Sequence, residues 1–224
     1  MQVLLVSLSF GCGSLCAEVE ALSGESTLLA IGDSILATNA RTCQSIPHHA
    51  ALSLGRPVDN RAVSGRSVSK GSDRIPAHYE AGDWDWVIVD GGANDIVSVC
   101  GAAEVDDVID GLASADVADG DMVELVDRIV ADGARVILLG YYPMKERARY
   151  GFDDCAEALA ALNTRYQQLA ESRTEVEFVF LGEVIDPEDT PDAYRSDRVH
   201  PSPEGSKRAG ELVAERIREV EARD

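Results

Sequence analysis

The amino-acid sequence predicts an α/β fold built around one parallel sheet. Five short β-like runs alternate along the chain with stretches of helical periodicity, which implies parallel strands joined by right-handed crossovers. Three of the runs (LLAI, VIV and VILLG) are continuously apolar, as expected for strands that helices cover on both faces. The length of 224 residues suits one domain with a full core and is too short for two comfortable ones.

The predicted strands are short apolar runs, and functional groups are expected on the loops beyond their carboxyl ends. They span Leu28 to Ile31, Val58 to Val63, Trp86 to Asp90, Val136 to Gly140 and Glu177 to Leu181.

The predicted helices repeat apolar residues at three- and four-residue steps, the pattern of one face packed on a core. Gly101 to Asp121, rich in Asp, Ala and Gly, is predicted to be a surface excursion within the domain, partly helical at Val105 to Leu112. The three clear apolar stripes run from Met122 to Val130, from Ala158 to Leu169 and from Ala209 to Val220.

The charge is strongly acidic, with 40 Asp and Glu against 20 Lys and Arg and a formal net charge of −20. Such a surface repels phosphate backbones and anionic membranes, so a nucleic-acid partner is not expected. No run of eighteen uncharged apolar residues occurs, so stable membrane insertion is not expected either. The negative charge indicates a highly soluble protein or one adapted to a saline environment. The alternative is that the charge steers a cationic substrate toward the protein.

Residues 1–20 resemble a secretory signal peptide. Val3 to Phe10 is apolar, small residues follow through Ala17, and Glu18 and Glu20 come next, although a basic n-region is missing. We expect export, with a mature chain that begins near Ala17 or Glu18, and a single domain over residues 21–224. The alternative is an apolar extension on a cytoplasmic protein.

Cysteine usage is compatible with export. Cys12 and Cys16 fall in the predicted leader, which leaves an odd number, Cys43, Cys100 and Cys155. These could form one disulfide and one free thiol, or three buried free thiols. No CxxC pair or His/Cys cluster has metal-ligand spacing, so no metal is expected.

The first strand leads into Gly32-Asp33-Ser34-Ile35 and a helix-like segment. A serine at this strand-to-helix turn has its hydroxyl above the sheet edge and its N–H at a helix amino terminus, which favours developing negative charge. The alternative is an ordinary helix N-cap serine.

Glycine-bearing turns follow the second and third strands on the same edge. They are Val63-Ser64-Gly65 and the segment from Asp90 to Asp95, which contains Asn94. Glycine lets backbone N–H groups approach a ligand closely, and the Asn94 amide adds uncharged donors. Each could also be a plain turn.

Asp197 and His200 lie three residues apart just before the last helix. At this spacing the carboxylate can bind one imidazole nitrogen and leave the other free to take a proton from a serine. The other histidines lack a carboxylate at this spacing and are predicted to be helix-surface or loop residues: His48, His49 and His78.

Taken in order, these segments resemble the conserved blocks of the SGNH/GDSL hydrolase family of lipases and esterases. The resemblance covers the chain from about Leu28 to the end. It implies a flavodoxin-like three-layer α/β/α sandwich with a five-stranded parallel sheet of order 2-1-3-4-5. Ile35 stands where many members have leucine, and the Gly-x-Ser-x-Gly elbow of ordinary α/β-hydrolases is missing.

The resemblance also implies the roles of the site residues. Ser34 would be the nucleophile, His200 the general base and Asp197 the residue that orients it. The N–H groups of Ser34 and Gly65 and the side chain of Asn94 would form the oxyanion hole. No cofactor is needed for this chemistry.

The predicted function is a serine ester hydrolase, of the esterase, lysophospholipase or thioesterase kind, acting on small-molecule or lipid-like esters. Three alternatives stay open: an acyltransferase, a sugar O-acetyl esterase and a catalytically silent binding module. Trp84 and Trp86 fall at the start of the third strand, away from Ser34, which disfavours sugars. Ile96, Val97, Val99 and residues 141–144 could line an apolar acyl slot or simply pack under loops. The acyl chain, the alcohol and the oligomeric state are not predicted.

Overall fold

The computed structural model describes residues 15–223 and contains a five-stranded, all-parallel sheet. The strand order is β2-β1-β3-β4-β5, which confirms the parallel α/β fold and the order implied by the resemblance. The strands are β1 (Leu28–Ile31), β2 (Val58–Asn60), β3 (Trp86–Val89), β4 (Arg135–Gly140) and β5 (Val176–Phe180).

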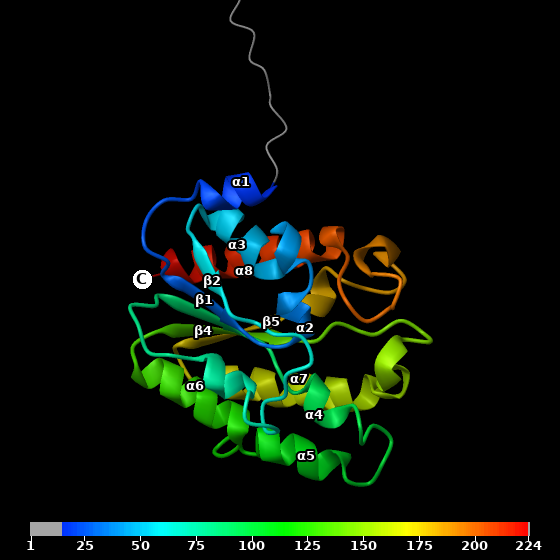
Figure 1. The fold of residues 1–224 in the computed structure, drawn as a ribbon. Coiled ribbons are helices and arrows are strands. Elements are labelled where there is room, and N and C mark those ends of the chain that lie inside the picture. Colours follow the sequence, from blue (N-terminus) through cyan, green and yellow to red (C-terminus); the bar gives the residue numbers. More distant parts are fainter. Residues whose placement is uncertain (1–14, 224) are drawn as a thin grey trace, which may run out of the picture.

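Helices cover both faces of the sheet and complete the three layers (Figure 1). One face carries α1 (Leu15–Glu20), α3 (Ile46–Leu54) and α8 (Pro203–Glu221). The opposite face carries α4 (Ala93–Ile96), α5 (Val105–Leu112), α6 (Asp121–Ala131) and α7 (Ala156–Glu171). The short helix α2 (Ser34–Ala37) lies at the carboxyl edge of the sheet.

The hydrophobic core is built around the central strands of the sheet. Every residue of β1 and β3 is buried, because helices cover these strands on both faces. Residues of β2 and β5 are partly exposed at the two edges of the sheet. No helix within residues 15–223 has the length and apolar content needed to cross a membrane.

The second strand is shorter than predicted and ends at Asn60 rather than Val63. The Asn60 side-chain oxygen accepts the Ala62 N–H at 3.1 Å, so this side chain takes the place of a strand partner. Val63 still donates to the Gly32 carbonyl at 3.0 Å. The turn after β2 is therefore attached to the turn after β1.

The helix predicted at Val105 to Leu112 is present as α5 with the same bounds, and its buried Ile109 and Leu112 place this part of the predicted surface excursion in a helical layer. Helix α3 was not predicted, and it packs against α8 at Gly210, where a Cβ would collide with His49. His48 and His49 are half-buried residues of this helix.

The cysteines correct the sequence prediction, because every cysteine within residues 15–223 is paired, as Cys16–Cys43 and Cys100–Cys155. Residues 1–14 of the predicted leader, with Cys12, lie outside the described residues. Leu15–Glu20 form α1. Cleavage near Ala17 would remove Cys16 and with it this disulfide.

Candidate active site

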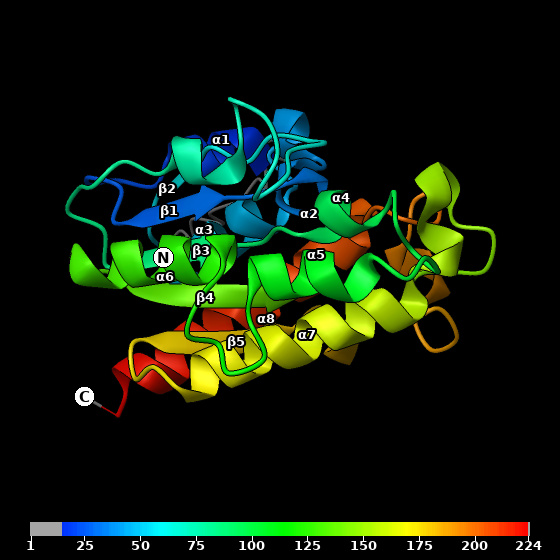
Figure 2. The same ribbon diagram turned by 90° about the horizontal axis from the view of Figure 1, so that it is seen from below.

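The predicted site segments meet at the carboxyl edge of the sheet. Figure 2 shows the loops after β4 and before α8 extending beyond the same end of the sheet as α2 and α4. The four segments come from distant parts of the chain, and hydrogen bonds between them define the site.

Ser34 is the first residue of α2, and Asp33 is its N-cap. The Asp33 carboxylate accepts the Ile35 N–H at 2.9 Å, so the capping role that was the alternative for Ser34 belongs to Asp33. The Ser34 hydroxyl makes no hydrogen bond to any residue that the structure describes. It is half-buried at the amino end of a helix and available for another partner.

Asn94 connects the turn of Ser34 to the loop of Gly65. Its side-chain nitrogen donates to the Arg66 carbonyl at 2.9 Å and lies 3.4 Å from an Asp33 carboxylate oxygen. Gly65 has a φ of 80°, and a Cβ there would touch nothing, so glycine is favoured by the backbone conformation rather than by packing. The three predicted oxyanion-hole residues thus lie on directly connected segments.

Asp95, next to Asn94, fixes the rest of that loop. Its two carboxylate oxygens accept the N–H groups of Val68 and Ser69 at 2.8 and 3.0 Å. Burial raises the pKa of Asp95, and these hydrogen bonds offset only part of the effect. The sequence analysis gave Asp95 no role, although its position next to Asn94 could have suggested that it belongs to the site.

Asp197 and His200 form the predicted hydrogen bond, with 3.0 Å between an Asp197 oxygen and His200 Nδ1. The other Asp197 oxygen accepts the N–H groups of Val199 and His200 at 3.0 and 2.9 Å. Burial alone would raise the pKa of Asp197, but these hydrogen bonds outweigh it and hold the pKa below its ordinary value. Asp197 therefore stays ionised, and His200 Nε2 is left without a partner among the described residues.

The His200 segment lies beside the Ser34 turn. The Asn39 side chain donates to the Pro201 carbonyl at 3.1 Å and to Ser206 at 2.9 Å. The structure contains no direct Ser34–His200 hydrogen bond, a contact that in unliganded enzymes often forms only with substrate.

A buried acid network lies beneath Ser34. The Tyr141 hydroxyl donates to Asp33 at 2.8 Å, and the Asp90 carboxylate accepts the Asp33 N–H at 2.7 Å. Burial raises the pKa of both carboxyls, and that of Asp90 lies well above its ordinary value. A Cβ at Gly32 would collide with Asp90, so glycine is required there. The sequence analysis missed this network, which an aspartate ending a buried apolar strand could have suggested.

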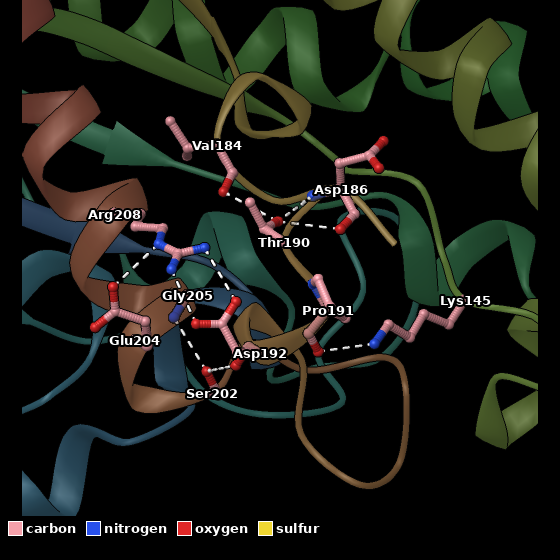
Figure 3. A network of polar contacts seen from close by, with 10 residues as sticks. All are labelled: Lys145, Val184, Asp186, Thr190, Pro191, Asp192, Ser202, Glu204, Gly205 and Arg208. Atoms are coloured by element: carbon pink, nitrogen blue, oxygen red, sulfur yellow. Dashed lines mark hydrogen bonds and ion pairs between the residues drawn. The ribbon is translucent and has the colours of Figure 1, made fainter. Parts of the chain in front are cut away.

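A second polar network holds the segment that carries His200 (Figure 3). Ser202 caps α8 by accepting the Gly205 N–H at 3.1 Å and donates to the Asp192 carbonyl at 2.6 Å. Lys145, in the loop after β4, donates to the Pro191 carbonyl at 2.8 Å. Further contacts join Arg208 to Asp192 and Glu204, and Thr190 to Val184 and Asp186.

His78 has no carboxylate at the three-residue spacing, as predicted, but its Nε2 lies 2.8 Å from Asp73, five residues away. His48 contacts the Ser45 hydroxyl at 2.6 Å. Within residues 15–223, no group of three His, Cys, Asp or Glu side chains could hold a metal ion.

The predicted apolar slot is only partly formed. Ile96, Tyr141 and Tyr142 are buried, and both tyrosine hydroxyls make internal hydrogen bonds, so these residues pack in the core. One flank of Tyr141 to Met144 nevertheless lines a cavity of about 110 Å³ against α7 and Phe180.

A covered parallel sheet with a serine, an aspartate–histidine pair and amide donors at its carboxyl edge is the architecture of SGNH-type hydrolases. The chain belongs to the GDSL-like lipase/acylhydrolase family, whose sequence model matches residues 30–208. None of the curated proteins compared with the chain matches it.

Solved structures share the fold. The aryl esterase of M. smegmatis is 16% identical, with a TM-score of 0.65 over 88% of this chain and 100% of that one. A carbohydrate acetylesterase family member from Sinorhizobium meliloti is 19% identical, with a TM-score of 0.63 over 88% of this chain and 99% of that one. At these identities the likeness establishes the fold alone.

Proposed function

We propose that this hydrolase is a carboxylic ester hydrolase with Ser34 as its nucleophile. One observation carries the proposal. The Asp197–His200 pair lies beside a serine at a helix amino terminus whose hydroxyl has no hydrogen-bond partner among the described residues. Membership of the GDSL-like family supports the same conclusion.

The proposed mechanism is two-step acyl transfer. His200 Nε2 takes the proton of Ser34 as its oxygen attacks the ester carbonyl, and Asp197 stabilises the imidazolium. The N–H groups of Ser34 and Gly65 and the Asn94 amide stabilise the oxyanion. His200 then protonates the leaving alcohol, and water hydrolyses the acyl-enzyme by the same route. The substrate is a small-molecule or lipid-like ester.

Two neighbouring activities use the same residues. Transfer of the acyl group to an acceptor other than water differs only in the product, so product analysis separates it from hydrolysis. A sugar O-acetyl esterase differs in its substrate. A silent binding module is disfavoured, because it would have no need of a paired Asp197–His200 beside an unengaged Ser34.

Labelling with a fluorophosphonate tests the nucleophile. We expect the reagent to modify Ser34, and Ser34→Ala to lose labelling and roughly a thousandfold or more of the esterase activity. Its thermal unfolding should be unchanged, because the hydroxyl makes no hydrogen bond within the described part of the chain. Ser98→Ala, at an exposed serine after α4, is the matched control. Full activity in Ser34→Ala would overturn the proposal.

We also propose that the protein is exported. The apolar run of residues 3–10 supports this, and so do two disulfides, because disulfides persist in oxidising compartments. Since Cys16 is bonded to Cys43, processing should occur before Cys16 rather than near Ala17.

A further inference from the structure

Two large hydrophobic side chains are exposed within residues 15–223, and both adjoin the candidate active site. Val63, 38% exposed, directly precedes Ser64 and Gly65. Tyr150 is 66% exposed, and its ring centroid lies 5.9 Å from that of His200 with the planes tilted by 60°. Single exposed apolar side chains are common on protein surfaces, so exposure alone gives neither residue a role, and what distinguishes Tyr150 is its ring beside His200.

The backbone of Tyr150 is held in an unfavourable conformation. Its φ of 64° and ψ of 17° lie in the left-handed region, which is costly for a residue with an aromatic side chain. Such strain persists only where the surroundings fix it, and it concentrates at functional sites. Here it places a tyrosine ring beside His200 with most of its surface open to solvent.

The surroundings of Tyr150 do fix it. The preceding residue, Arg149, donates its N–H to the Asp197 carbonyl at 3.1 Å. Five residues after Tyr150, Cys155 is bonded to Cys100, on the connection between α4 and α5. The Tyr150 segment is therefore tied both to the loop of Asp197 and to the region that follows Asn94.

His200 does not need Tyr150 for its orientation, because Asp197 already binds Nδ1. The Tyr150 hydroxyl makes no hydrogen bond within the described part of the chain, so Tyr150 does not stabilise the neighbouring loops through its hydroxyl. In the proposed mechanism His200 protonates the leaving alcohol, so a group beside His200 on the solvent side faces the alcohol part of the ester.

We propose that Tyr150 is a specificity-determining platform for the leaving alcohol, and that it favours an alcohol carrying an aromatic ring. This rests on the proposed esterase function.

Tyr150 is an aromatic residue beside the site that the sequence analysis did not identify. Both tryptophans lie away from Ser34, but Tyr150 provides an aromatic face beside the chemistry. No sequence pattern marks it, since its position depends on the loop conformation.

The test compares butyrate esters that share the acyl group and differ only in the alcohol: methyl, benzyl, cyclohexylmethyl and glucosyl. Tyr150→Ala should lower kcat/KM for the benzyl ester about five- to tenfold, the size of one aromatic contact, mainly through KM. The methyl ester, whose alcohol is too small to reach the ring, should change less than twofold. Tyr150→Phe should behave like the wild type, and thermal unfolding should be the same in all variants.

Val63→Ala, which truncates the other exposed side chain, is the matched control and should leave the benzyl-to-methyl ratio unchanged. An equal loss for the methyl and benzyl esters in Tyr150→Ala would overturn the platform, because it would mean an effect through His200. A larger loss for the cyclohexylmethyl or glucosyl ester than for the benzyl ester would overturn the aromatic preference. A wild type that hydrolyses none of the esters would instead overturn the proposed function and this assignment with it.

Discussion

The carboxylates at the candidate site lie in environments that shift their pKa values in opposite directions. Asp197 accepts hydrogen bonds at both oxygens, which outweigh its burial and keep its pKa low. Asp90 is buried beside Asp33, and both effects raise its pKa. The residue beside His200 is therefore kept charged, whereas the pair beneath Ser34 favours holding a proton.

Asp90→Asn tests this difference through the pH dependence of stability. A carboxyl whose pKa is higher in the folded state contributes stability below its ordinary pKa of about 4 and loses it as the pH rises toward the folded value. The asparagine cannot ionise and keeps an acceptor for the Asp33 N–H. The variant should therefore gain stability relative to the wild type as the pH rises, by up to about 1.4 kcal/mol per pH unit.

Urea unfolding at several pH values between about 4 and 8 measures this gain. Asp106→Asn, at an exposed carboxylate on α5, is the control and should show no such trend. Parallel stability curves for Asp90→Asn and the wild type would contradict the raised pKa.

At the scale of the elements, the site depends on loops that are tied to one another. The loop after β4 is joined to the loop before α8 through Lys145 and Arg149, and to the connection after α4 through Cys100–Cys155. A rigid parallel sheet fixes where each loop starts, and these contacts fix where each loop lies.

Removing the Cys100–Cys155 disulfide should therefore affect both stability and activity. We expect the double variant Cys100→Ser/Cys155→Ser to lose about 2–4 kcal/mol of unfolding free energy. It should also lose selectivity for aromatic alcohols, because the Tyr150 segment is freed. The measurements are chemical unfolding and the benzyl-to-methyl ratio of kcat/KM.

The matched control is Cys16→Ser/Cys43→Ser, which removes a disulfide joining α1 to the segment before α3. It should lose stability and retain the substrate ratio. An equal change of the ratio in both double variants would show that the effect is a general loosening of the protein.

At the scale of the whole molecule, the two disulfides support the proposed export, because disulfides persist in oxidising compartments. Expression with the native amino terminus in a bacterial host, followed by amino-terminal sequencing of the exported protein, tests this. We expect the mature chain to begin before Cys16 and to contain both disulfides. Intact residues 1–20 on cytoplasmic protein with reduced thiols would remove the export proposal.

The sequence by itself determined the parallel sheet, the last three helices and the four segments that hold Ser34, Gly65, Asn94 and the Asp197–His200 pair. Strand and helix periodicity arises between near neighbours, and the carboxyl ends of parallel strands must meet at one edge. The three-residue spacing of Asp197 and His200 is local in the same way, so their hydrogen bond could be predicted.

Only the tertiary structure decided which distant residues meet. Tyr141 binds Asp33 across 108 residues, and Cys16 and Cys100 find their partners 27 and 55 residues away. Tyr150 lies beside His200 because a strained loop is fixed at both ends. No short-range pattern encodes such pairings, because each depends on how the loops settle on a sheet that must already be folded.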